Sequence, residues 1–286
     1  MGAVFALASA VSYGLSDFLG GVLSRRGSFV RVALCGQVGS LVSMALVAPL
    51  VSVTVPDFAD LAWGGLSGVG TGLGMMFLFR GMSRGPMSVV VPTSAVGGLA
   101  LPVLVGVAVL GERPAPLAWV GIALALPALW WVSCGKADDG RGVRGAVGDG
   151  LISSTGIALQ YLALAQAGPG SGTWAVVAGR VTSIIVVAVV SATMRRGASR
   201  SDSDDDIHRT RLDVAAGCTG ALAGLALICY LYATRTELVT IAVVLSSLYP
   251  VIPVLLGVTV LRERLTRSQT AGLITALVAT VLIATT

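Results

Sequence analysis

Residues 102–126 read PVLVGVAVLGERPAPLAWVGIALAL, and residues 253–277 read PVLLGVTVLRERLTRSQTAGLITAL. The two stretches align without a gap at an offset of 151 residues, and 12 of their 25 positions are identical. The shared proline, Glu-Arg pair and glycine argue against a coincidence of composition. The chain therefore contains an internal repeat.

Ten apolar stretches run through the chain, each close to the roughly 20 residues that a membrane-spanning helix needs. Backbone groups in lipid have to pair within their own segment, so each stretch is predicted to be a helix. The predicted spans are residues 2–23, 29–51, 59–80, 86–110, 115–134, 149–167, 171–194, 213–233, 237–261 and 267–285.

The repeat divides these spans into two sets of five. Residues 1–134 form the predicted first repeat, 135–148 a Gly-rich charged linker, and 149–286 the second repeat. Because five is odd, the second set starts from the opposite side of the membrane. The predicted fold is an all-α integral membrane protein of ten transmembrane helices, arranged as two inverted five-helix repeats.

The composition excludes several classes of protein. Hydrophobic residues make up 55% of the chain and charged residues only 12%, against about 25% charged in soluble domains. The net charge of +5 comes from arginines between apolar runs, which is typical of membrane-flanking charge and not of nucleic-acid binding. The single histidine, His208, lies in a polar loop, and no cysteine pair has metal-ligand spacing, so neither an enzyme nor a metal or other cofactor is expected.

Small residues recur at helical spacing in two of the spans. Gly64, Gly68 and Gly72 share one face of the third span, and Gly70 and Gly74 share another. In the eighth span the same spacing joins Gly217 to Ala221 and Gly220 to Gly224. Such faces let the backbones of neighbouring helices approach closely, so tight helix packing is predicted at both spans.

Inverted repeats are a hallmark of secondary transporters, whose solute site lies near the bilayer midplane between the halves. The architecture therefore favours a carrier of a small solute, embedded in the lipid bilayer. A flippase or carrier for a lipid-linked solute is the alternative. The substrate, the direction of transport, the coupling ion and the oligomeric state do not follow from the pattern.

The stretch 85–113, GPMSVVVPTSAVGGLALPVLVGVAVLGER, resembles the repeat of the EamA-type branch of the drug/metabolite transporter superfamily. The span that opens near Trp119-Val120-Gly121 and the Tyr13-Gly14 pair of the first span are similar as well. The resemblance implies a solute carrier, often an exporter of metabolites or amino acids. It leaves the substrate open.

Arg180 is the sharpest candidate inside the membrane, because an ionisable group at the bilayer centre costs at least about 2.5–3.5 kcal/mol. It resembles an arginine that the family often carries in the second span of a repeat, where the first half has Gln37 or Val38 instead. Arg180 is either a counter-charge for an anionic group or a structural residue. The predicted substrate-binding set, chosen by depth in the spans, is Arg180, Gln37, Gln160, Tyr13, Tyr161 and Tyr249.

Asp17 is the one acidic residue well inside a predicted span. It lies about 10 Å deeper than the Arg25-Arg26 end of its helix and about 10 Å short of Arg180, which argues against a direct pair with Arg180. It is either a proton-coupling group or a carboxylate that reaches back toward Arg25 or Arg26.

Matched prolines in the fourth and ninth spans are expected to bend or interrupt those helices, either as hinges or as static kinks. Interrupted spans in both halves of a transporter point to the binding site and the moving parts. The predicted hinge residues are Pro92, Pro102, Pro250 and Pro253. Glu112 and Glu263, next to arginines at span ends, are interpreted as interfacial structure.

The flanking charge predicts an orientation. Sixteen Lys and Arg residues fall in the odd-numbered connections, against two, Arg113 and Arg235, in the even-numbered ones. The positive-inside rule then places both termini outside the cytoplasm. The family resemblance implies termini inside. The Arg-rich, Lys-poor composition indicates a bacterial cell membrane as the location.

Overall fold

The computed structural model describes residues 2–51, 56–110, 115–133, 140–168, 171, 173–195, 206–236, 245–246 and 248–284. Within these residues every regular element is a helix, and the ten helices fit a membrane protein. They are α1 (Gly2–Arg26), α2 (Phe29–Val51), α3 (Phe58–Arg84), α4 (Met87–Leu110), α5 (Pro116–Ser133), α6 (Gly140–Ala165), α7 (Trp174–Arg195), α8 (Asp206–Thr236), α10 (Val251–Thr259) and α11 (Arg267–Ala284).

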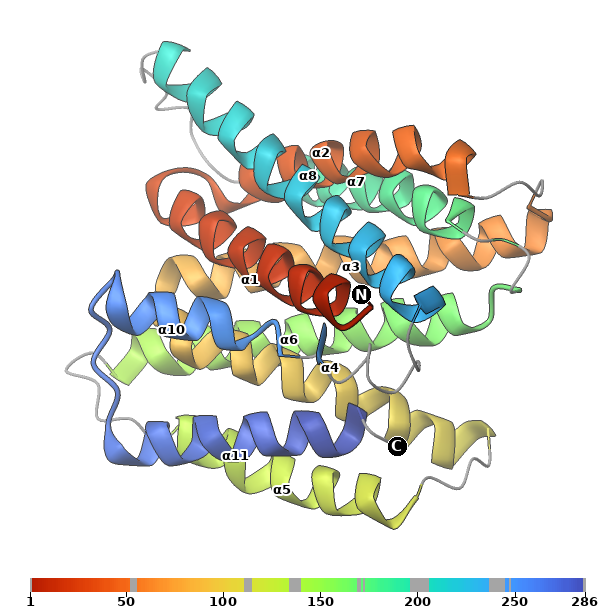
Figure 1. The fold of residues 1–286 in the computed structure, drawn as a ribbon. Helices are drawn as coiled ribbons and strands as arrows, with labels where there is room; N and C mark the ends of the chain where they lie inside the picture. Colours follow the sequence, from red (N-terminus) through yellow and green to blue (C-terminus); the bar gives the residue numbers. More distant parts are fainter. Residues whose placement is uncertain are drawn as a thin grey trace.

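The helices run back and forth between two ends of one bundle (Figure 1). The C-terminal ends of α1, α3, α5, α7 and α10 all point toward one end, on the left of the view. Both chain termini lie toward the other end. The odd-numbered connections, which carry most of the basic residues, therefore begin at one common face.

Six helices are long and apolar enough to cross a membrane, judged by length and composition. These crossing segments are Gly2–Arg26, Phe29–Leu50, Phe58–Arg84, Met87–Ala108, Trp174–Thr193 and Arg209–Tyr230. Shorter apolar helices at Trp119–Ala128 and Arg267–Ile283 fall within α5 and α11. The helical class and the apolar character predicted from the sequence are thus confirmed.

The two glycine faces of α3 contact two different neighbours, as their spacing predicts. A Cβ at Gly68 would collide with the backbone oxygen of Gly179 on α7. On the other face, a Cβ at Gly70 would lie 2.5 Å from the oxygen of Gly156 on α6. The absence of side chains therefore lets α3 press its backbone against both helices.

The glycines of α8 serve the same purpose against α2. A Cβ at Gly39 would overlap the backbone of Gly217, and one at Gly220 would overlap the backbone of Gly36. Both overlaps involve main-chain atoms, which cannot rotate away. This contact confirms the close packing predicted for the eighth span.

Two helices begin earlier than the hydropathy predicts. Helix α6 starts at Gly140, inside the predicted linker 135–148, and α8 starts at Asp206, inside the polar loop 195–211. Hydropathy predicts which part of a helix is apolar, but a helix can continue beyond its apolar part. The charged turn that holds Arg144, whose side chain is exposed, is therefore part of α6.

The proline-containing spans differ from each other. Helix α4 runs unbroken through Pro92 and Pro102, so the predicted interruption is absent there. Hydroxyls beside Pro92 supply local bonds, with Thr93 Oγ1 donating to Val89 O and Ser94 Oγ to Val91 O. In the ninth span, a turn at 248–250 precedes α10, whose N-cap is Pro250.

Candidate functional site

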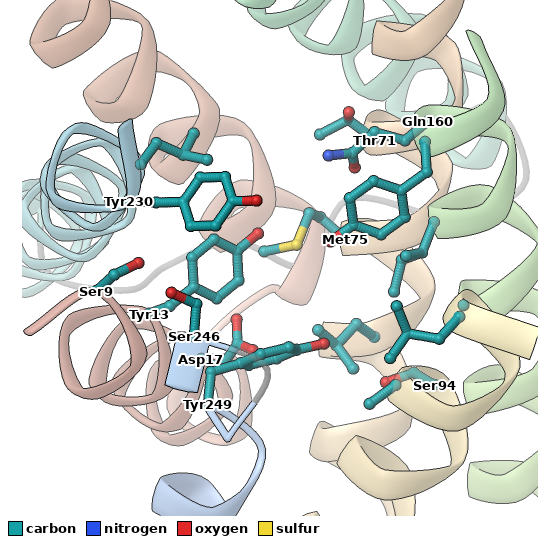
Figure 2. A pocket seen from close by; sticks show the side chains of 17 residues that line it. Ser9, Tyr13, Asp17, Thr71, Met75, Ser94, Gln160, Tyr230, Ser246 and Tyr249 are labelled. Atoms are coloured by element: carbon teal, nitrogen blue, oxygen red, sulfur yellow. The ribbon is translucent and has the colours of Figure 1, made fainter. Parts of the chain in front are cut away.

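A cavity of about 260 Å³ lies inside the bundle, between α1 and α8 on one side and α3, α4 and α6 on the other (Figure 2). Its apolar lining comes from Met75, Leu78, Ala95, Gly98, Leu99, Ile157 and Leu227. Its polar lining comes from Ser9, Tyr13, Asp17, Thr71, Ser94, Gln160, Tyr161, Tyr230, Ser246 and Tyr249. The predicted residues Tyr13, Asp17, Gln160, Tyr161 and Tyr249 are thus brought together.

Helix α1 contributes three of these polar groups. Ser9, Tyr13 and Asp17 follow one another at intervals of four, which puts them on one face of the helix. Ser16 points elsewhere, since its hydroxyl donates to Thr219 O of α8 at 2.7 Å. The polar stripe of α1 is therefore divided between the cavity and the contact with α8.

Tyr249 reaches the cavity because the turn before α10 lies directly against α1. A Cβ at Gly14 would be 2.6 Å from Tyr249 O and 2.6 Å from Ile252 Cβ, so only glycine fits this position. The Tyr13 and Tyr249 rings pack edge to face, with centroids 5.2 Å apart and planes at 68°. The neighbouring residues Tyr13 and Gly14 thus fix the position of the turn.

Asp17 is the most unusual group in the cavity wall. Its residue is 2% exposed, and its Oδ1 atom is buried without a hydrogen-bond partner. Arg25, considered from the sequence as a partner, instead donates to Met82 O, Gly85 O and Glu263 Oε1. Among the described residues the carboxylate is therefore held in the membrane without an ion pair.

Arg180 and Gln37 lie beside this cavity and do not line it. They line an adjoining space of about 20 Å³, to which Tyr13 and Met75 also contribute. Arg180 Nη1 donates to Gln37 Oε1 at 2.9 Å, and Ser183 Oγ donates to the same oxygen at 2.9 Å. Arg180 Nε is buried without a partner. Direct substrate binding by these two residues stays a prediction, because they lie one layer behind the main cavity.

The predicted site residues leave out five of the polar lining residues: Ser9, Thr71, Ser94, Tyr230 and Ser246. Thr71 lies among the glycines of α3, whose spacing predicts helix packing, and Ser94 lies between the proposed hinge residues Pro92 and Pro102. Neither position therefore indicates a binding residue. Tyr230 carried the clearest signal, because a tyrosine inside an apolar run is rare in a chain that has only five. The sequence indicates how far along a span a residue lies, but it does not indicate whether that face of the helix is turned toward the cavity.

The end of the cavity toward the odd-numbered connections is closed. Buried apolar side chains fill this end, among them Phe18, Phe79, Met82 and Met87. Beyond them, Glu263 accepts hydrogen bonds from Met87 N at 2.9 Å, Ser88 N at 3.0 Å and Ser88 Oγ at 2.7 Å. Glu263 therefore caps the first turn of α4, in keeping with the interfacial role predicted for it. Glu112, its counterpart in the repeat, lies outside the described residues.

Comparisons with known proteins agree with this architecture. The model of the EamA-like transporter family matches residues 142–285, which is half of the chain. One solved crystal structure is 20% identical, covers 97% of this chain and 97% of its own, and has a TM-score of 0.52. A likeness at that identity concerns the fold alone. Among curated proteins, none matches the chain.

Proposed function

Because the chain belongs to the EamA-like transporter family, we propose that it is a secondary transporter that moves a small metabolite across the cell membrane by alternating access. The observation that carries the proposal is the cavity itself. Apolar membrane-type helices enclose a hollow that is closed at one end and lined by both apolar and polar side chains, among them the buried Asp17, whose Oδ1 atom has no hydrogen-bond partner. A helix bundle with only a structural role has little reason to keep such a group in lipid.

The helix contacts support the inverted repeat, with halves at 1–134 and 149–286. When the second set of five repeats the first, α6, α7 and α8 correspond to α1, α2 and α3. The contacts of α3 with α6 and α7 then correspond to those of α8 with α1 and α2. Equivalent helices also touch one another in the pairs α2–α7, α4–α10 and α5–α11. This pattern fits a two-fold axis in the membrane plane.

Alternating access requires the closed end to open. On this proposal Glu263 is a latch, since it joins the segment after α10 to α4 and, through Arg25, to α1. Opening breaks these bonds and separates the apolar side chains beneath them. The prolines Pro92, Pro102, Pro250 and Pro253 are the proposed hinges for this movement.

Asp17 is the proposed coupling group. On this proposal Asp17 takes up a proton on one side of the membrane and releases it on the other, and this exchange drives the cycle. Tyr13, Tyr161 and Tyr249 line the same cavity as Asp17. We propose an orientation with both termini outside the cytoplasm, which is supported by the excess of basic residues in the odd-numbered connections.

A lipid-linked solute is less well supported. A carrier of that kind needs a basic pocket for a phosphate group. The described lining residues of the main cavity include no arginine, lysine or histidine. Arg180, the nearest candidate, already donates to Gln37.

Comparison of metabolites in cells with and without the protein tests the proposal. We expect one or a few small solutes to change in concentration, and we expect Tyr249→Ala to abolish the change. Tyr232→Ala is the matched control, because Tyr232 stacks on Phe5 and does not line the cavity. A metabolite profile that is identical with and without the protein would refute the proposal, as would full activity of the Tyr249→Ala variant.

A further inference from the structure

The chemistry of the cavity identifies a class of solute. We propose that the cavity binds a small organic cation, an amine or quaternary ammonium ion without a carboxylate, with its positive charge beside Asp17. This inference rests on the proposed transport function and narrows it to one charge class.

The first argument is the charge of the cavity wall. Asp17 is the one ionisable acid or base among the lining residues that the structure describes, apart from the tyrosines. It is 2% exposed, and its Oδ1 atom has no hydrogen-bond donor. No ion-pair partner for this carboxylate is found among the described residues, so a cationic ligand would supply one. An anionic ligand would add repulsion to the same site.

The second argument is the position of Arg180. A zwitterion such as an amino acid needs a positive group for its carboxylate as well as a negative one for its amine. The Arg180 guanidinium lies in the adjoining space and bonds to Gln37, which also accepts the Ser183 hydroxyl. Tyr13 and Met75 line both spaces and form the boundary between them. The described lining of the main cavity therefore holds one acidic group and no basic one, and the nearest guanidinium, that of Arg180, lies behind Tyr13.

The third argument is the density of aromatic groups. Tyr13, Tyr161, Tyr230 and Tyr249 all line the cavity, although the whole chain has only five tyrosines. Figure 2 shows the hydroxyl groups of Tyr13, Tyr230 and Tyr249 directed into the space between the helices. Tyrosine offers a cation both a π face and a hydroxyl oxygen, and clustered aromatic rings are a common way to hold ammonium groups. The same rings shield the apolar part of an amine from water.

The size of the cavity limits the ligand. Its volume of about 260 Å³ is just below the range of roughly 300–1,000 Å³ that is typical of pockets for drug-sized ligands. A compact amine fits this space, whereas a polyamine chain or a large multi-ring dye does not.

Four probes with one carbon skeleton separate the charge classes. They are phenethylamine as the cation, phenylalanine as the zwitterion, phenylpropionate as the anion and phenethyl alcohol as the neutral compound. Choline serves as a second cation, with the neohexyl alcohol in which carbon replaces its nitrogen as the neutral analogue. Binding to the purified full-length protein in detergent is measured by calorimetry, and flux of each probe is measured in proteoliposomes.

We expect both cations to bind and the matched anion, zwitterion and neutral compounds to bind at least about tenfold more weakly. Asp17→Asn should weaken cation binding by roughly 30-fold or more, because it removes one partner of a buried charge pair. Asp17→Glu keeps the charge and should keep the binding, which shows that any loss in Asp17→Asn is not misfolding. Asp213→Asn is the control for charge, since Asp213 pairs with Arg31 away from the cavity.

The outcomes separate this inference from the proposed function. Preferred binding of the zwitterion, anion or neutral probe would overturn the cation site. Flux of that preferred probe in proteoliposomes would still support the proposed transport function. Failure of both cations to bind, or cation binding that Asp17→Asn leaves unchanged, would also overturn it. Cation binding without flux of any probe would keep the site and count against transport.

Discussion

Arg25 Nη2 and Glu263 Oε1 lie 2.8 Å apart, although 238 positions separate the two residues in the chain. The pair joins the last turn of α1 to the segment that follows α10. Glu263 is 9% exposed at its side chain and Arg25 is 30% exposed, so water screens the pair only in part. Since Glu263 also caps α4, three helices meet at one carboxylate.

Replacing Glu263 by Gln removes the charge of this carboxylate and keeps its shape. We expect the variant to lose about 1–2 kcal/mol of stability, because the cap at the first turn of α4 and the pair with Arg25 both weaken. The drop appears as a lower Tm in detergent. Arg31→Gln breaks the more exposed pair with Asp213 and should cost only about 0–1 kcal/mol. Equal losses in the two variants would contradict a special role for Glu263.

Gly39→Ala tests the contact between α2 and α8. Its Cβ would overlap the backbone of Gly217, so the helices would have to separate, at a cost of about 1–3 kcal/mol. Gly148→Ala in α6 is the matched control, because no atom lies within 4 Å of its Cβ. The control should stabilise the helix by roughly 0.5–1 kcal/mol. Thermal unfolding of both variants measures the difference, and a tolerated alanine at position 39 would show that the helices are farther apart.

Arg180 and Gln37 should behave as one unit. Arg180→Ala removes the donor at 2.9 Å from Gln37 Oε1, and Gln37→Leu removes the acceptor shared with Ser183. Side chains in one hydrogen-bond network show coupling energies of about 0.5–3 kcal/mol. The double variant is therefore expected to lose less stability than the sum of the single variants. Strictly additive losses would mean that the two side chains act independently.

The same variants distinguish positioning from direct binding. One layer of side chains, which includes Tyr13 and Met75, separates Arg180 from a solute in the main cavity. Arg180→Ala should therefore change the rate of transport without changing which solutes compete. Competition assays in proteoliposomes measure this selectivity. A change in the rank order of competing solutes would return Arg180 to the binding site, as the sequence interpretation had it.

A reporter at the C-terminus tests the orientation. The bias of sixteen basic residues against two predicts that both termini lie outside the cytoplasm. A C-terminal alkaline phosphatase fusion should then be active, and a green fluorescent protein fusion should stay dark. The opposite pair of signals would show that the family's usual orientation applies.

The sequence predicted features that repeat along a helix. The two glycine faces of α3 and those of α8 follow from spacing alone, and the structure brings each face against another backbone. The spacing of Tyr13 and Asp17 along one helix was also readable, and the structure places both on the cavity wall.

Contacts between distant segments were not predictable. The bonds from Met87 and Ser88 to Glu263 depend on where α10 ends relative to α4. The rotation of α7 decides that Arg180 faces Gln37 and not the main cavity. A single sequence carries hydropathy and spacing, whereas these contacts arise from tertiary packing.

The glycine contacts of α3 have a mechanical consequence. A helix pressed backbone to backbone against α6 and α7 has little room to slide between them, so we expect these three helices to move together. Helix α8 is held in the same way to α2 and, through Ser16, to α1. Each trio mixes segments from both sequence halves, and the cavity lies on the seam between them. A rocking motion between the two trios would therefore not separate the two sequence halves from each other. Each moving block would contain helices from both halves.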